Sequence, residues 1–251
     1  MEFAMTTTTE PRWKSLTLLA ITIASTLIVF LHAPIPQAQD YHRFADEKVY
    51  GGIPHTLNVL SNLAFLWVGL LGLVVCRQLG NLRNRIAWTI TFVGIALVSL
   101  GSAYYHWAPN DQSLVWDRLP MTIAFMAFLS ALLGEYLGER ITRIVLLPSL
   151  LMGISSVVYW YFTNDLRWYA WVVFVPLILI IALLALYKSV HRTSLLLMLA
   201  FYVAAKLGEA FDAPIYSTLG NLISGHSIKH LLAAVACYWM VRIVRRSALQ
   251  G

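Results

Sequence analysis

The sequence predicts an all-α, polytopic membrane protein, a bundle of eight spanning helices. First, 59% of the 251 residues are hydrophobic and only 12% are charged, with a mean hydropathy of +0.69. A soluble domain carries about a quarter charged residues. Second, apolar runs of about 18 to 25 residues recur along the chain, the length needed to cross a bilayer. The runs are continuous rather than alternating, which indicates helices and argues against a barrel.

Eight apolar segments follow one another along the chain, and each is long enough to be a spanning helix. They cover residues 14–34, 57–76, 86–107, 118–138, 142–162, 168–187, 193–211 and 222–243. The connections between them are short except at 35–56 and 212–221. Because no long polar insert separates the segments, we expect one compact bundle.

The first segment follows Arg12 and Lys14, a basic start that would also suit a signal peptide. Its apolar run is long, however, and no A-x-A cleavage site follows it, so we expect a retained helix. Residues 1–4, MEFA, look like a cloning scar, which makes Met5 the expected native start. Residues 1–13 would then form a cytoplasmic N-terminal segment.

The later segments are apolar helices with few polar positions. The second contains Ser61 and Asn62, which we expect to hydrogen-bond each other or a neighbouring helix. The third ends in the polar stretch GSAYYHW. The sixth begins with Trp168 and Tyr169, aromatic residues that are typical of a membrane interface.

Basic residues indicate how the helices are oriented. With the N-terminus in the cytoplasm, 12 of the 18 Lys and Arg residues fall on cytoplasmic segments, and each such segment holds at least two. The twelve are Arg12, Lys14, Arg77, Arg83, Arg85, Arg140, Arg143, Lys188, Arg192, Arg242, Arg245 and Arg246. This positive-inside pattern accounts for the net charge of +6 without a nucleic-acid partner, and it predicts that both termini are cytoplasmic. Compact loops and the lack of an organelle retention signal favour a bacterial inner membrane.

Polar side chains gather at the predicted outer ends of three helices. Ser102 and His106 are four residues apart, so they share one helix face, and His226 and His230 share a face of the last helix. Asp117 opens the fourth helix. Ionisable residues at membrane depth are costly, which makes these side chains functional candidates. The pattern alone leaves two interpretations open, a metal site with three histidines or a set of interfacial histidines.

A second polar cluster lies on the seventh segment, in the stretch AAKLGEAFD. Lys206, Glu209 and Asp212 are three residues apart and lie roughly on one face. They are either paired structurally or positioned to bind the polar headgroup of a lipid substrate. Lys229 is expected to point to a different face from the histidine pair.

The order Ser-x3-His, an Asp eleven residues later, and His-x3-His opening the last helix resembles the CREST superfamily of membrane hydrolases. Within it, the chain most resembles the alkaline ceramidases and their bacterial relatives, over about 57–243. The stretch LNVLSNLAFLWVGLLGL (57–73) is similar to the first core helix of that family. The resemblance implies a seven-helix hydrolase core over 57–246. The segment 14–34 is then an extra N-terminal transmembrane helix, and 35–56 is an outer loop.

The resemblance also implies a function and a site. It implies a zinc-dependent hydrolase that cleaves the amide bond of ceramide or a related N-acyl lipid, with His106, His226 and His230 as zinc ligands. Ser102 and Asp117 are the implied catalytic residues. Two alternatives stay open, a lipid esterase or acylhydrolase of the same superfamily, and a seven-helix receptor or sensor that contains zinc without hydrolysing a substrate.

One segment departs from the family pattern. Alkaline ceramidases carry an acidic, calcium-binding segment that ends in a glutamate before the first core helix. The comparable stretch here is DYHRFADEKVYGGIPHTLNV, with Asp40, Asp46 and Glu47, and His55 stands where the glutamate is expected. The substitution argues against Ca²⁺ as a second cofactor, and we expect a solvated loop that caps the bundle.

Overall fold

The computed structural model describes residues 11–80, 82 and 84–249 as an all-α bundle, which confirms the predicted fold class. Its helices run in the order α1 (Arg12–Leu31), α2 (Thr56–Leu60), α3 (Leu63–Gln78), α4 (Arg85–Trp107), α5 (Asp111–Leu137), α6 (Glu139–Thr163), α7 (Arg167–Leu186), α8 (Arg192–Ala210), α9 (Asp212–Thr218) and α10 (Gly225–Ser247). A short 3₁₀ helix, η1 (Gln39–His42), lies between α1 and α2. Eight segments are long and apolar enough to cross a membrane, with α2 and α3 together forming the second.

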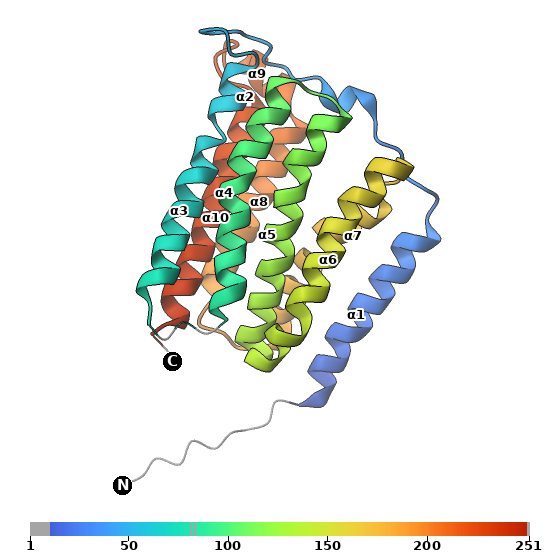
Figure 1. Ribbon diagram of the computed structural model, residues 1–251, viewed down its shortest axis with the longest axis vertical. Helices are drawn as coiled ribbons and strands as arrows, with labels where there is room; N and C mark the ends of the chain where they lie inside the picture. Colours follow the sequence, from blue (N-terminus) through green and yellow to red (C-terminus); the bar gives the residue numbers. More distant parts are fainter. Residues whose placement is uncertain (1–10, 81, 83, 250–251) are drawn as a thin grey trace.

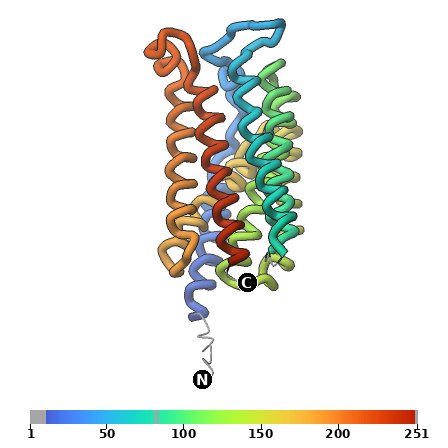
Figure 2. Tube along the Cα trace, turned by 90° about the vertical axis from the view of Figure 1, so that its left-hand side faces the viewer, coloured from blue at the N-terminus to red at the C-terminus, as the bar shows by residue number. Residues whose placement is uncertain are grey.

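The long helices lie side by side, and the two ends of the bundle differ (Figures 1 and 2). One end carries α2, α9 and the loop that contains η1, whereas α1 begins and α10 ends at the opposite end. This arrangement agrees with an even number of spans. Which end faces the cytoplasm stays a prediction. The cloning scar expected at residues 1–4 lies outside the described residues, and so does Arg83.

Small residues let the helices approach closely. A Cβ atom on Gly72 of α3 would collide with the ring of Phe92 in α4, and one on Gly101 of α4 would collide with the carbonyl oxygen of Trp116 in α5. Helix association in a bilayer depends on this close packing, because lipid tails are as apolar as the side chains. The Gly101 contact brings α4 and α5 together next to the polar residues at the η1 end.

The first helix lies at the edge of the bundle, beside α7 (Figure 1). Leu18 is its one buried residue, although the Trp171 Nε1–H of α7 donates a hydrogen bond to Thr26 Oγ1 at 3.0 Å. A helix with so little buried surface contributes little to the core. Its position fits an addition to the seven other spans.

Helix boundaries differ from the predicted ones at the η1 end. The fourth span begins at Asp111 rather than at residue 118, because Asn110 and Ser113 form a capping box that starts α5 two turns before the apolar run. The connection predicted at 212–221 contains the short helix α9. Asp117 therefore lies inside a regular helix and not at its first turn.

Candidate metal centre

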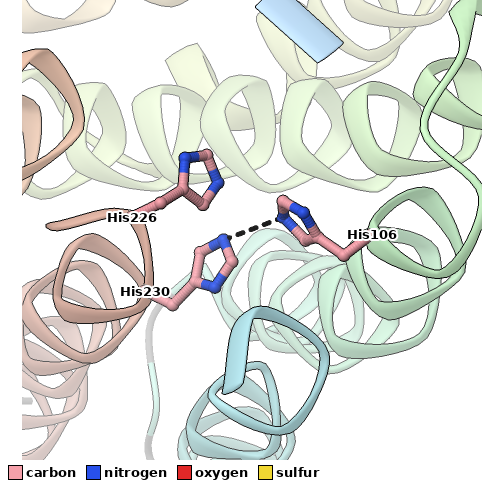
Figure 3. A group of neighbouring side chains, drawn as sticks. All are labelled: His106, His226 and His230. Carbon is pink, nitrogen blue, oxygen red and sulfur yellow. Dashed lines mark hydrogen bonds between the residues drawn. The ribbon is translucent and has the colours of Figure 1, made fainter. Parts of the chain in front are cut away.

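Three histidines meet at the η1 end of the bundle (Figure 3). His106, His226 and His230 are buried, and each offers one ring nitrogen within 4.8 Å of the other two. The Nε2 atoms of His106 and His230 are 3.2 Å apart. The three ring centroids are separated by 4.8 to 4.9 Å. The structure thus brings the three predicted ligands into a group that could hold a metal ion.

Local helix structure sets this geometry. His106 lies in the last turn of α4, and His226 and His230 lie in the first two turns of α10. The N-terminus of α10 is fixed by Ser224, whose side chain accepts a hydrogen bond from the Ser227 N–H at 3.1 Å. The spacing of four residues then stacks the two α10 imidazoles on the face toward α4.

A serine orients one of the imidazoles. Ser61 Oγ, between α2 and α3, lies 2.7 Å from Nδ1 of His230 and 3.1 Å from the carbonyl oxygen of Asn58. If the single hydroxyl proton of Ser61 goes to Asn58, its oxygen accepts the Nδ1–H of His230. The lone pair of His230 then lies on Nε2, which faces the centre of the triad. Ser61 thus hydrogen-bonds a neighbouring helix, as expected from the sequence, but the sequence pattern does not indicate that its partner is a histidine of the triad.

An aromatic ring covers the triad. The ring centroid of Phe44, in the loop after η1, lies 4.6 Å from that of His106 and 4.7 Å from that of His226. Phe44 is itself buried. The loop therefore closes over the histidines and limits access of water, a role that no pattern around Phe44 predicts.

The donor set fits a zinc ion. With Zn–N distances of about 2.0 to 2.1 Å, tetrahedral coordination places the ligand nitrogens roughly 3.3 Å apart. The 3.2 Å between the Nε2 atoms of His106 and His230 matches that separation. Neutral imidazoles are ligands that zinc prefers. Within the described part of the chain, the group contains three histidines and no carboxylate.

Ser102 and Asp117 face each other beside the triad. Both are buried, and Ser102 of α4 is an electrostatic neighbour of Asp117 in α5. Ser102 lies one turn before His106 on the same helix face, and the glycine next to it, Gly101, permits the close approach of α5. The predicted catalytic pair and the predicted ligand of α4 therefore share one interface.

The second predicted cluster is a network of charges. Glu209 of α8 binds two ammonium groups, since its Oε2 lies 2.5 Å from Lys206 Nζ and its Oε1 lies 2.5 Å from Lys229 Nζ. Lys229 Nζ also lies 3.4 Å from Nε2 of His226. The expectation that Lys229 faces away from the histidines was wrong. The two residues are three apart on α10, and the long lysine side chain reaches back to the imidazole.

Asp212 holds two segments together at the same end. Its Oδ1 accepts the backbone N–H of His226 at 2.7 Å, and its Oδ2 accepts the N–H of Ala45 at 2.9 Å. Asp212 thus joins the first turn of α10 to the segment between α1 and α2. This segment, residues 32–55, carries η1 and Phe44 and is called the covering loop below. A contact with a lipid headgroup stays a prediction for Asp212, as it does for Lys206 and Glu209.

The acidic residues of the covering loop also have structural contacts. Asp46 is fully buried, and its Oδ1 accepts hydrogen bonds from the Lys48 N–H at 3.1 Å and from the Tyr216 hydroxyl at 3.2 Å. The Asp46 carbonyl oxygen lies 2.9 Å from Nδ1 of His55. These contacts tie the loop to α9. The part of it around Asp46 is therefore packed rather than solvated.

Comparison with known protein families gives a match over most of the chain. A family model described as Ceramidase matches residues 50–250, a range that includes every candidate site residue and excludes α1. A search of curated proteins returned no match.

Proposed function

Because the chain belongs to the ceramidase family, we propose that it is a zinc-dependent hydrolase that cleaves the amide bond of ceramide or a related N-acyl lipid within the membrane. The observation that carries this proposal is the buried convergence of His106, His226 and His230. Ser102 and Asp117 are buried neighbours on the same helix interface. The eight apolar spans make the chain an integral membrane protein, which suits a lipid substrate.

The number of protein ligands supports catalysis rather than a purely structural or sensory role for the metal. Structural zinc sites usually have four protein ligands, whereas catalytic sites have three and keep the fourth position for water or substrate. The described residues that could hold the ion are three histidines, and Asp117 is not among them. Asp117 is thus available for proton transfer.

The neighbouring side chains have distinct chemical roles. Zinc, when bound to the triad, polarises the scissile carbonyl and lowers the pKa of a water molecule to roughly 7. The Asp117 carboxylate accepts a proton from the attacking water and returns it to the nitrogen of the leaving amine. The Ser102 hydroxyl donates a hydrogen bond to the carbonyl oxygen as negative charge develops there, a contribution of about 3 kcal/mol.

The position of the site suits a lipid amide. The triad lies near one end of the bundle, at the start of α10 and the end of α4, so a scissile bond there would sit near the membrane interface. The acyl chain would extend along the apolar helices. The buried Phe44 ring limits water at the reacting bond.

Hydrolysis of a lipid panel tests the function directly. Purified protein is incubated with N-acyl sphingosine, an N-acyl ethanolamine and the matched O-acyl esters, and the released fatty acid is measured by mass spectrometry. We expect cleavage of amides that a chelator abolishes and added zinc restores. If the zinc-loaded protein cleaves only the esters, the lipid esterase alternative holds. If it cleaves none of the lipids, the hydrolase proposal is wrong.

A further inference from the structure

Two cationic side chains, one buried and one partly buried, lie at the same end of the bundle as the triad. Arg118 of α5 is 5% exposed, and its guanidinium lies 4.1 Å from the ring centroid of Trp160 and 4.5 Å from that of Tyr169. Lys229 of α10 lies 3.4 Å from Nε2 of His226. A charge removed from water is costly unless an opposite charge compensates it. The carboxylates and hydrogen-bond acceptors near these two cations therefore indicate whether a ligand must supply the missing partners.

The protein compensates them incompletely. Glu209 is shared between Lys229 and Lys206, so one carboxylate serves two ammonium groups. Arg118 forms no ion pair among the described residues, and its Nη2 donates to the neutral Gln37 Oε1 at 2.7 Å. The Nη1 atom of Arg118 is buried without a hydrogen-bond partner in the described part of the chain. Asp117 is a neighbour of both cations, but it forms no ion pair with Arg118 in the described part of the chain, and a metal ion would add further positive charge.

The two cations share neighbouring side chains. The Arg118 guanidinium lies 5.7 Å from the ring centroid of Tyr41 in η1, and Tyr41 is an electrostatic neighbour of both Arg118 and Lys229. Tyr202 of α8 is a neighbour of Lys229 and Tyr41, and Tyr169 of α7 is a neighbour of Arg118 and Tyr41. Tyrosine hydroxyls can donate hydrogen bonds to an anion. The region therefore combines two cations, one of them with an unpaired guanidinium nitrogen, with neutral donors.

We propose that Arg118 and Lys229 bind an anionic group, a carboxylate, phosphate or sulfonate, on the amine portion of the N-acyl lipid substrate. This inference rests on the proposed hydrolase function and narrows its substrate class. An anion would pair with the free Nη1–H of Arg118 and with the ammonium group of Lys229, which shares Glu209 with Lys206. A neutral headgroup without an acceptor for it would leave the Arg118 Nη1–H unpaired in a desolvated site, which disfavours such a substrate.

Matched substrate pairs test the charge preference. The pairs are N-palmitoylglycine with N-palmitoylglycine amide, and ceramide 1-phosphate with ceramide, because each pair differs in the anionic group. We expect kcat/KM for the anionic member to exceed that for the neutral member by roughly tenfold or more. Equal or faster cleavage of the neutral members would overturn the inference while leaving the proposed function intact.

Substitutions of Arg118 and Lys229 test whether these two cations cause the preference for anionic lipids. Lys229→Met and Arg118→Met should each lower kcat/KM for the anionic lipid by roughly tenfold and change that for the neutral lipid much less. Arg118→Lys should keep part of the preference because it keeps the charge. Lys188→Met, an equal charge change at the opposite end of the bundle, should leave the preference unchanged. Unchanged preference in properly folded, zinc-loaded Lys229→Met and Arg118→Met would contradict the assignment.

Two further measurements distinguish an anionic group on the substrate from a separate anion in solution or on a lipid headgroup. If inorganic phosphate or phosphatidylglycerol vesicles accelerate cleavage of neutral ceramide, and Arg118→Met abolishes that acceleration, the cations bind a separate anion and the inference is wrong. The shift in Tm on adding each lipid measures binding independently of turnover. A larger shift with the anionic members would support the inference even if cleavage failed, and equal shifts would overturn it.

Discussion

The Ser61 hydroxyl lies 2.7 Å from Nδ1 of His230, at the point where the second span breaks into α2 and α3. Its oxygen also lies 3.1 Å from the carbonyl oxygen of Asn58. With the Ser61 proton donated to Asn58, the contact leaves Nε2 of His230 free for a metal. A residue on one helix thereby controls the chemistry of a ligand on another, and this relationship can be tested.

Ser61→Ala should weaken zinc binding by roughly 10- to 100-fold, because loss of a hydrogen-bond partner frees the ring orientation and tautomer of a metal-bound histidine. Competition with a chelator of known affinity measures the change. Ser155→Ala serves as the control, since among the described residues the Ser155 hydroxyl bonds only to its own helix, through Leu151 and Met152. Equal zinc affinity in the two variants would contradict the role assigned to Ser61.

His226→Ala should abolish zinc binding, because two histidines are too few ligands for a stable zinc site. Elemental analysis of purified protein should give about one zinc per chain for the native sequence and almost none for the variant. The matched control is His191→Ala, since His191 is a buried histidine outside the triad, 3.9 Å from Glu135. Full zinc content in a folded His226→Ala protein would remove His226 from the ligand set.

Asp117→Asn should keep zinc and lose amide hydrolysis. Asn cannot accept the proton from the attacking water, and general base catalysis typically contributes a factor of about 100 to 10,000. The measurements are kcat on an N-acyl lipid and zinc content in the same preparation. Asp40→Asn, in the exposed part of the covering loop, should behave like the native protein. Activity near the native level in Asp117→Asn would rule out the proposed base.

The ion pair between Asp165 and Arg167 should make the thermal stability of the protein depend on pH. Asp165 is 3% exposed, its Oδ2 lies 2.8 Å from Arg167 Nη2, and its Oδ1 accepts the Ile35 N–H at 3.3 Å. Hydrogen bonds from Arg167 lower the pKa of Asp165 to about 2. Because the pKa is lowered on folding, the stabilisation is present above the unfolded pKa of about 3.9 and is lost as pH falls toward 2.

Asp165→Asn should therefore lower Tm at pH 7, and the difference from the native protein should shrink between about pH 4 and pH 2. Thermal unfolding in detergent across that range measures it. The difference between the two proteins is the informative quantity, since other carboxylates titrate equally in both. A difference that is constant from pH 7 to pH 2 would contradict the assignment.

Much of the fold follows from hydropathy, but helix ends do not. Eight apolar runs predict eight spans because a bilayer demands long apolar helices. The first two turns of α5 are polar, and they are helical because of the cap at Asn110 and the packing of Trp116 against Gly101. Neither cause is visible in an apolar window. The α9 helix was missed because it is too short to give an apolar window of spanning length.

Some parts of the candidate site could be predicted from the sequence and others could not. Helical periodicity predicts that Ser102 shares a face with His106 and that His226 shares one with His230, and the structure has both arrangements. Phe44 and Lys229 could not be predicted, because their positions depend on how a loop folds over the bundle and how far a flexible side chain reaches. Local periodicity carries no information about either.

The last prediction concerns orientation in the membrane. The positive-inside pattern places the end that carries η1 and α9 outside the cytoplasm. Tyr50 lies in the covering loop at that end and is 55% exposed, whereas Lys188 is exposed at the opposite end, between α7 and α8. In intact cells, a membrane-impermeant maleimide should label Tyr50→Cys and leave Lys188→Cys unlabelled. The native sequence, with buried Cys76 and partly buried Cys237, gives the background. The reverse labelling pattern would invert the topology and place the triad at the cytoplasmic face.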